Sequence, residues 1–319
     1  MYDISVKISV IIPVYNCQGY FEECLQSVQN QTLKDLEIIV IDDNSDDFDY
    51  GEYIRTLNDN RIKFYRNAKR KGVSFCRNYG IKVSSGVYLS FLDGDDFFPD
   101  KTSLLRLFLL AEQKKLDICG GSLVIVNKTS QPVNWKFSGQ YFDKCGALEY
   151  KDYQHDGGFY RFIYRKWFIY KENLIFPELE RMQDPVFFVN AMLAAKRIYV
   201  IDTYVYAYRK LHKKIYWSQR KVLDHYSAIK TIMNIASDNN LSHLYYLMVK
   251  NFYHFSIRNL HKVGTLKDQF ALVWSFLKII NFNLLSHKWP SDSESFCRSK
   301  VFSVLFINKF FNLWRKFQS

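Results

Sequence analysis

Short apolar runs alternate with amphipathic stretches over the first hundred residues of the chain. Residues 8–13 (ISVIIP) and 36–41 (LEIIVI) have the length and β-branched composition of buried strands, and residues 61–65 (RIKFY) alternate as a half-buried strand does. Helical periodicity fills the intervals at residues 19–31, 53–57 and 72–83. Strands that recur at about 30 residues or a little less are typical of βαβ units, so the pattern predicts a parallel, doubly wound sheet.

Acidic residues gather where two of the predicted strands end. Residues 42–47 (DDNSDD) follow the second strand, and Asp93-Gly94-Asp95-Asp96 follows a turn and a buried strand at residues 84–92. An open α/β sheet holds its ligand at the carboxyl ends of its strands. Because Mg²⁺ is commonly shared between one or two carboxylates and substrate phosphates, an Asp-x-Asp here suggests a metal-bridged diphosphate. A solvated acidic turn is the simpler alternative for this motif alone.

Five short motifs, taken in their order and spacing, resemble the nucleotide-binding half of a family 2 glycosyltransferase with the GT-A fold. The motifs are residues 9–16 (SVIIPVYN), 27–32 (SVQNQT), 41–47 (IDDNSDD), 72–81 (GVSFCRNYGI) and 93–96 (DGDD). The resemblance implies an α/β fold of the Rossmann-like GT-A type, with a mostly parallel sheet flanked by helices and a C-terminal helical extension. It continues more loosely to about residue 215.

The expected domains follow from this resemblance and from the helical, aromatic pattern of the C-terminal third. Residues 1–215 would form the GT-A domain, with a nucleotide-binding half at 1–115 and an acceptor half at 116–215. Residues 216–319 would form an α-helical region.

Carried over residue by residue, the resemblance implies a nucleotide site. Asp43 would accept a hydrogen bond from the nucleobase, usually uracil, and Asp93 would face the ribose. Asp95 would hold Mn²⁺ or Mg²⁺, and Arg77 can offer a planar fork of donors. Without the resemblance, a polar turn cap for Asp43 and a surface helix charge for Arg77 are the simpler interpretations. The positions implied to bind the nucleotide are Pro13, Val14, Tyr15, Asn16, Asp43, Lys71, Arg77, Asp93 and Gly94.

In the acceptor half, the segment at residues 180–193 has one acidic residue, Asp184, at the start of an apolar-periodic helix. Asp184 is followed by Pro185, and this pair is typical of the N-cap and first position of a helix, so capping alone would explain it. The resemblance implies a general base instead, since inverting family members commonly carry an acidic pair here whose second acid is the base. In this chain the pair is Gln183-Asp184, which leaves any role of the first acid in doubt.

Two segments offer weaker candidates. His212 lies in a basic segment at residues 206–213, and some family members bring a histidine from this region onto the metal; a neutral imidazole can ligate one. Arg209 or Lys213 in the same segment could meet the diphosphate, and a basic surface loop is the alternative for the whole segment. The aromatic-rich stretch at residues 157–168 could form an acceptor wall, or simply core. The positions expected to reach an acceptor there are Gly157, Gly158 and Arg161.

Composition and charge bear on the cellular compartment and on the kind of partner. The chain has 319 residues with 48% hydrophobic content, and its six cysteines form no C-x-x-C pair, which favours reduced thiols in the cytosol. Met1 leads straight into the first strand, so no signal peptide is expected. The net charge of +12 comes with no nucleic-acid recognition motif, and no nucleic-acid partner is expected.

The C-terminal segment at residues 301–317 places basic and amide side chains opposite Phe, Leu and Trp. This is typical of a helix in a membrane interface, although a helix docked on the protein's own core would show the same pattern. No run in the chain reaches the roughly 18 apolar residues of a spanning helix.

These observations together predict an inverting glycosyltransferase. It would move a sugar from a nucleotide-diphosphate donor, most simply a UDP-sugar, to a hydroxyl of a growing bacterial surface glycan such as a capsule, O-antigen or lipooligosaccharide, free or lipid-linked. It would work at the inner face of the cell membrane. The glycan and the bacterial setting come from the resemblance. A sugar-nucleotide nucleotidyltransferase and a catalytically silent sugar-nucleotide-binding protein are the alternatives, and the sequence does not specify the sugar, the linkage or the oligomeric state.

Overall fold

The computed structural model describes residues 6–133, 139–210 and 215–286. The chain divides into two compact units, each described by itself. The sheet unit comprises Met1–Tyr153, Gly157–Glu178 and Phe187–Lys214. The helical unit comprises Gln154–Asp156, Leu179–Val186 and Ile215–Ser319. The helical unit therefore takes in two short segments that the sequence interpretation assigns to the acceptor half.

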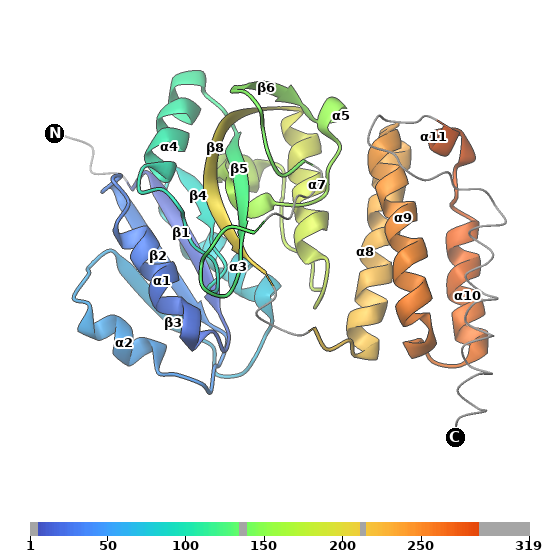
Figure 1. The fold of residues 1–319 in the computed structure, drawn as a ribbon, viewed down its shortest axis with the longest axis horizontal. Helices are drawn as coiled ribbons and strands as arrows, with labels where there is room; N and C mark the ends of the chain where they lie inside the picture. The colour runs from blue at the N-terminus through green and yellow to red at the C-terminus, as the bar shows by residue number, and fades with distance from the viewer. Residues whose placement is uncertain (1–5, 134–138, 211–214, 287–319) are drawn as a thin grey trace. The chain divides into compact units, whose positions relative to one another are not determined.

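A mixed, mostly parallel sheet forms the centre of the sheet unit (Figure 1). Its strand order is β3-β2-β1-β4-β7-β5-β8-β6. Strands β3, β2, β1 and β4 are parallel to one another, and β5 is parallel to β8. Strand β7 is antiparallel to β4 and β5, and β6 is antiparallel to β8. The strands are β1 (Ile8–Val14), β2 (Leu36–Asp42), β3 (Ile62–Arg66), β4 (Tyr88–Phe91), β5 (Ile118–Val126), β6 (Gly146–Glu149), β7 (Phe162–Arg165) and β8 (Arg197–Arg209). The predicted fold class is thus confirmed.

Helices cover both faces of the parallel strands, as the alternation of side chains along β1 requires. Ile12 of β1 belongs to the apolar cluster that includes Phe21 and Leu25 of α1. Ile11 points to the other face, where it meets Gly80 of α3. The helices of this unit are α1 (Gln18–Gln29), α2 (Tyr50–Thr56), α3 (Val73–Val83), α4 (Ser103–Lys114), α5 (Tyr150–Tyr153) and α6 (Lys166–Lys171), with a 3₁₀ turn η1 (Phe159–Arg161).

Strand β8 runs from Arg197 to Arg209 and pairs with β5 as far as the Val126–Arg209 register. The register shifts near Gly120 and Ser122, which lets the long strand curve. Residues 206–209 are therefore strand, so the alternative of a basic surface loop, which the sequence left open for this segment, is wrong for them.

The helical unit is built from α8 (Gln219–Asp238), α9 (Ser242–Asn259), α10 (Leu266–Leu277), the short α11 (Phe282–Ser286) and a 3₁₀ turn η2 (Leu260–Lys262). Helices α8, α9 and α10 lie side by side (Figure 1) around an aromatic core. Phe252 of α9 stacks on Phe276 of α10 with ring centroids 4.0 Å apart, and Tyr226 of α8 meets both rings edge-on. Aromatic residues thus supply this core, as their frequency in the sequence suggests.

None of the helices in the described residues is long and apolar enough to cross a membrane. The amphipathic segment at 301–317 lies outside the described residues.

Helix α7 (Gln183–Ala195) is shared between the units. Its first residues, through Val186, belong to the helical unit, and the rest belongs to the sheet unit, where Phe187 stacks on Phe176 with centroids 3.9 Å apart. The residue proposed from the sequence as the base, Asp184, is therefore on the part of α7 that belongs to the helical unit.

Candidate active site

The loops that follow β1 and β2 are bonded to each other. The Asn16 side chain donates to Oδ1 of Asp46 at 2.6 Å and accepts from the Asp46 backbone N–H at 3.1 Å. Its own backbone N–H donates to Ser45 Oγ at 3.2 Å. Asn16 has a φ of 47°, a left-handed conformation that Asn adopts more readily than most residues. The predicted nucleobase loop, Pro13 to Asn16, is therefore held in one conformation by the neighbouring loop.

A cationic side chain covers the exposed aromatic ring of this loop. Tyr15 is 38% exposed, and the guanidinium carbon of Arg70 lies 4.0 Å from its ring centroid. The neighbouring Lys71 lies over the ring of Phe75, with Nζ 4.1 Å from the centroid. Arg70 was not among the residues predicted from the sequence, although the Lys69-Arg70-Lys71 run could have drawn attention to it.

Asp43 ties the loop after β3 to the end of β2. Its Oδ1 accepts from the Lys71 backbone N–H at 2.7 Å and from Asn67 Nδ2 at 2.8 Å, while Oδ2 accepts from the Gly72 N–H at 2.8 Å. Gly72 has a φ of 92°, which a side chain would strain, and it directly precedes α3. The polar-turn interpretation of Asp43 is therefore what these bonds show, and they fix the start of α3.

Arg77 is buried, so the interpretation as a surface helix charge is wrong. Its guanidinium donates to Oδ1 of Asp93 at 2.6 Å, and its carbon lies 4.7 Å from the ring centroid of Phe159 and 5.2 Å from that of Phe176. Two aromatic faces and a carboxylate therefore surround the cation in the interior. Arg77 thus orients Asp93, the residue implied to face the ribose.

The Asp93–Asp96 turn is packed tightly against the loop after β1. A Cβ on Gly94 would stand 2.9 Å from both Cys17 Sγ and Val14 Cγ1, so only glycine fits this position without a shift. Gly94 and Val14, both predicted to bind the nucleotide, are therefore in direct contact across two strand ends.

Asp96, which the sequence interpretation left without a role, is the buried anchor of this turn. It accepts from the Tyr206 hydroxyl at 2.7 Å and from the Arg209 backbone N–H at 2.7 Å. Burial and the nearby charges of Asp95 and Asp93 raise the pKa of Asp96 well above its usual range. The charges of Asp93 and Asp95 therefore lie close together in this turn, and Asp95 is only partly buried.

The residues present are compatible with a divalent cation at Asp95. Within residues 6–133, 139–210 and 215–286, no three His, Cys, Asp or Glu side chains are grouped so as to hold a metal by themselves. Mg²⁺ and Mn²⁺ in nucleotide sites need fewer protein ligands, because substrate phosphates and water complete the shell. The second ligand suggested from the sequence, His212, lies outside the described residues.

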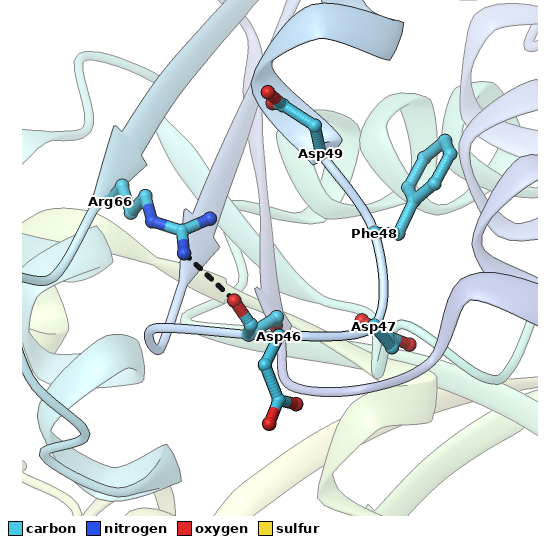
Figure 2. Close-up of a pocket in the computed structure, with 6 residues that line it drawn as sticks. Asp46, Asp47, Phe48, Asp49 and Arg66 are labelled. Atoms are coloured by element: carbon cyan, nitrogen blue, oxygen red, sulfur yellow. Dashed lines mark hydrogen bonds between the residues drawn. The ribbon is translucent and has the colours of Figure 1, made fainter.

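An open hollow of about 490 Å³ adjoins the loop after β2 (Figure 2). It is lined by Ser45, Asp46, Asp47, Phe48, Asp49 and Arg66. Arg66 donates to the Ser45 carbonyl at 2.8 Å, the dashed line in Figure 2, and to Asp42 Oδ2 at 2.7 Å. Because three aspartates line it and none of the predicted nucleotide residues does, this hollow does not fit a diphosphate.

Two arginines predicted to meet substrate are buried instead. Arg161 is 2% exposed and donates to the Gln140 carbonyl at 2.5 Å, and further to the Gly139 carbonyl and the Tyr153 hydroxyl. The expectation that it reaches the acceptor is therefore wrong. Of the two glycines named with it, Gly157 is exposed, and Gly158 has a φ of 85° with its Cα face towards the Arg161 side chain.

The guanidinium of Arg209 likewise binds groups of the protein itself. It is 1% exposed, and its guanidinium donates to the Asp95 carbonyl at 2.9 Å, to the Lys128 carbonyl at 3.1 Å and to Glu23 Oε2 at 2.5 Å. The expectation that Arg209 meets the diphosphate is wrong, because these bonds hold it in the interior. It supports the backbone of the candidate metal ligand instead.

Asp184 lies in the first turn of α7, which begins at Gln183, so it is not the N-cap that the sequence pattern suggested. Asp156 also belongs to the helical unit. Burial, together with the charge of Asp184, raises the pKa of Asp156 to about 6. Asp156 was not predicted from the sequence, where nothing but its place before Gly157-Gly158 marks it.

Solved structures with the same architecture define the class of this fold. Two structures of Staphylococcus aureus TarS residues 1–349, in complex with UDP-GlcNAc and with UDP, superpose with TM-scores of 0.70 and 0.68. Both are 20% identical in sequence and cover 88% of this chain, and 83% and 82% of the TarS chain respectively. At that identity the likeness shows the fold, which is the GT-A fold expected from the motifs.

The chain belongs to glycosyl transferase family 2, whose family model matches residues 9–170. It is 33% identical over 213 residues to the uncharacterized glycosyltransferase EpsJ of Bacillus subtilis (strain 168), covering 64% of this chain and 61% of EpsJ. It is 34% identical over 210 residues to the poly(ribitol-phosphate) beta-glucosyltransferase of Bacillus spizizenii, covering 64% of this chain and 32% of that protein. The resemblance seen in the motifs is thus confirmed, and the chain spans less than two thirds of these relatives' length.

A third relative has a more detailed name. The GalNAc(5)-diNAcBac-PP-undecaprenol beta-1,3-glucosyltransferase of Campylobacter jejuni is 35% identical over 150 residues, covering 46% of this chain and 47% of that protein.

Proposed function

We propose that this protein is an inverting glycosyltransferase that moves a sugar from a UDP-sugar to a hydroxyl of a growing bacterial surface glycan. The observation that carries the proposal is the joining of the three strand-end loops after β1, β2 and β4, which gathers the family's nucleotide motifs at one edge of the sheet. Family membership supports the reaction class. The TarS complexes with UDP and UDP-GlcNAc support the donor.

On the donor side, uracil would lie against Pro13–Asn16 and donate its N–H to Asp43, whose carboxylate is already fixed by the Lys71 and Gly72 amides. Asp93, oriented by Arg77, would accept from the ribose hydroxyls. Asp95 would hold Mn²⁺ or Mg²⁺, which when bound supplies charge neutralisation for the departing diphosphate. Arg70 and Lys71 add exposed positive charge on the same side.

Asp184 would act as the general base. It would take the proton from the acceptor hydroxyl as that oxygen attacks the anomeric carbon, and the UDP leaving group would depart with the bonding electron pair. A base placed within hydrogen-bond reach contributes about 10²- to 10⁴-fold to such a step. A single displacement inverts the anomeric configuration.

The acceptor would be a surface polysaccharide such as capsule, O-antigen or lipooligosaccharide, free or lipid-linked. Two relatives support a cell-envelope acceptor, since one is named for poly(ribitol phosphate) and the other for an undecaprenol-linked glycan. Work on a lipid-linked acceptor would place the protein at the cytoplasmic face of the membrane, where the basic segment 301–317 could bind anionic lipid.

Calorimetric titration with UDP, GDP and dTDP, each with and without Mn²⁺, tests the donor assignment. We expect UDP to bind in a metal-dependent way and Asp95→Ala to abolish the metal dependence. Asp184→Asn should keep UDP binding and lower turnover of the UDP-sugar at least 100-fold, the lower part of the range for a lost general base. Pyrophosphate release from UTP and a sugar phosphate would instead identify a nucleotidyltransferase, and UDP-sugar binding without turnover by the unaltered protein would identify a silent binding protein.

A further inference from the structure

A buried carboxylate of the helical unit is bonded to the segment that carries Asp184. Asp224 of α8 is 6% exposed, and its Oδ2 accepts the backbone N–H of Glu180 at 2.8 Å. Asp224 also pairs with Arg220, one turn earlier on α8, at 3.1 Å, and the Arg220 side chain is 66% exposed. A charged acceptor on a backbone amide is among the stronger hydrogen bonds in proteins, so Asp224 fixes the chain four residues before Asp184.

A second tether holds the next residue. The guanidinium of Arg181 lies over the ring of Trp217, with its carbon 5.3 Å from the centroid. Trp217 in turn packs edge-on against Phe255 of α9 at 4.9 Å and against His225 of α8 at 5.5 Å, and those two rings stack at 3.8 Å. The segment that begins α7 is thus held to α8 and α9 by an ion–amide bond and by an aromatic stack.

The other short segment of the helical unit is held in a similar way. Gln154 Oε1 accepts the backbone N–H groups of His243 at 2.9 Å and Leu244 at 3.3 Å. These are among the first amides of α9, whose N-cap residue, Leu241, supplies no side-chain bond. Gln154 therefore caps α9 from outside that helix, two residues before Asp156.

We propose that Asp224 is a positioning residue for Asp184, and that the C-terminal helices thereby take part in the transfer reaction. The inference rests on the proposed role of Asp184 as general base. A base displaced by about 1 Å can cost about 10²-fold in rate, so a firm anchor four residues away has a direct effect on turnover. The nucleotide-binding residues belong to the sheet unit, and their affinity for UDP should not depend on this anchor.

Three variants of the full chain separate this role from a general loss of structure. Asp224→Ala removes the acceptor for the Glu180 amide, Asp224→Asn keeps a side-chain oxygen at the same place, and Arg220→Ala removes only the exposed partner. The assay measures UDP release from UDP-glucose and UDP-N-acetylglucosamine, with water as acceptor, and calorimetry measures UDP affinity with Mn²⁺. We expect Asp224→Ala to lower kcat about 10- to 100-fold with UDP affinity within about twofold, and Asp224→Asn and Arg220→Ala to stay near normal.

A double variant shows whether Asp224 acts through Asp184. If it does, Asp224→Ala should cost nothing further once Asp184 is Asn, since coupled residues are not additive. Equal losses in both backgrounds, or normal kcat in Asp224→Ala, would overturn the inference while leaving the base assignment intact. Near-normal turnover of Asp184→Asn alone would overturn the base assignment and the inference with it.

If Asp224→Ala fails to fold, Trp217→Leu can replace it in the same comparison, because it weakens the contact between Arg181 and Trp217. Thermal unfolding then checks that Trp217→Leu is folded. Hydrogen–deuterium exchange of residues 179–186 gives a readout independent of turnover. Faster exchange in Asp224→Ala or Trp217→Leu than in Arg220→Ala is expected, and equal exchange in all of them contradicts the anchoring.

Discussion

The hydroxyl of Tyr206 donates a hydrogen bond to Oδ2 of Asp96 at 2.7 Å, and it accepts one from the Asp93 backbone N–H at 3.2 Å. One phenol on β8 therefore fixes both ends of the Asp93–Asp96 turn. Because Tyr206 and Asp96 are both buried, neither can replace this bond with water. The geometry of the candidate metal ligand, Asp95, consequently depends on a residue more than a hundred positions further along the chain.

Tyr206→Phe should therefore weaken metal-dependent UDP binding. Removing the hydroxyl leaves the buried Asp96 with one donor fewer, which costs about 1–2 kcal/mol of stability and lets the turn move. We expect UDP affinity with Mn²⁺ to fall about 3- to 10-fold, a free-energy change of similar size. Tyr204→Phe, at a 47% exposed position on the same strand, is the matched control and should bind as the unaltered protein does. Calorimetry decides, and equal affinities would contradict the proposed dependence.

Gly94→Ala should damage the nucleotide site more severely. The added methyl group would meet Cys17 Sγ and Val14 Cγ1 at 2.9 Å, so the turn after β4 and the loop after β1 must separate. We expect UDP affinity to drop about 10-fold or more. Gly19→Ala offers a control in α1, where a Cβ meets nothing within 4 Å, and should keep the affinity while slightly stabilising the helix. Unchanged binding by Gly94→Ala would show that the two loops are not part of one site.

The imidazole of His225 should make the helical unit sensitive to acid. Burial, aided by the positive charge of Arg181 and opposed by a bond to Asn251, lowers the pKa of His225 to about 4. A lowered pKa means that stability is fully present above about pH 6.5, the unfolded value, and is lost as the pH falls towards 4. When the pH falls from 7 to about 4.5, the free energy of unfolding of His225→Gln should fall by about 2–3 kcal/mol less than that of the unaltered protein. Urea unfolding at both pH values measures this difference. His254→Gln on α9 is the control, and identical pH profiles for all three proteins would refute the assignment.

Asp156 should make stability depend on pH in the opposite direction from His225. Its pKa is raised to about 6 by burial and by the charge of Asp184, so the folded state binds its proton more tightly than the unfolded state does. Stability is then greatest below the unfolded value near pH 4 and is lost as the pH rises through 6.

We therefore expect Asp156→Asn to stabilise the protein at pH 8 by about 1–2 kcal/mol, with no gain at pH 4. Thermal unfolding across this range measures the effect. In an Asp184→Asn background the gain should shrink, because one source of the raised pKa is gone. A gain that does not depend on pH would point to packing rather than ionisation.

The nucleotide-binding half was readable from the sequence because its determinants are local. The apolar runs at β1 and β2 and the motifs at their ends specify buried parallel strands and polar loops within short windows. The family resemblance then gave the candidate site its residues. Element boundaries differ from the expected ones by only a few residues there, as for α2, which begins at Tyr50 rather than Tyr53.

The sequence does not reveal which groups bind its buried arginines. Arg77, Arg161 and Arg209 all look like surface or substrate-binding cations, yet each is buried. Arg161 and Arg209 are satisfied largely by backbone carbonyls, and a carbonyl leaves no mark in a sequence pattern. The structural grouping of Asp184 with the C-terminal helices rests on the contact between Glu180 and Asp224, 44 positions apart, which no local window includes.

Because helix α7 is shared between two units, the C-terminal helices cannot be exchanged freely between related chains. A cut at residue 215 looks like a natural boundary along the sequence, but the helices beyond it hold residues 154–156 and 179–186 in place. An exchange of the C-terminal region between relatives at that point would deliver new helices without their matching anchors for these two segments. Recombination in this family would therefore succeed only where the two parent chains already agree at Gln154 and Arg181, whose side chains make these contacts, so the helical region and the acceptor side are expected to be inherited together.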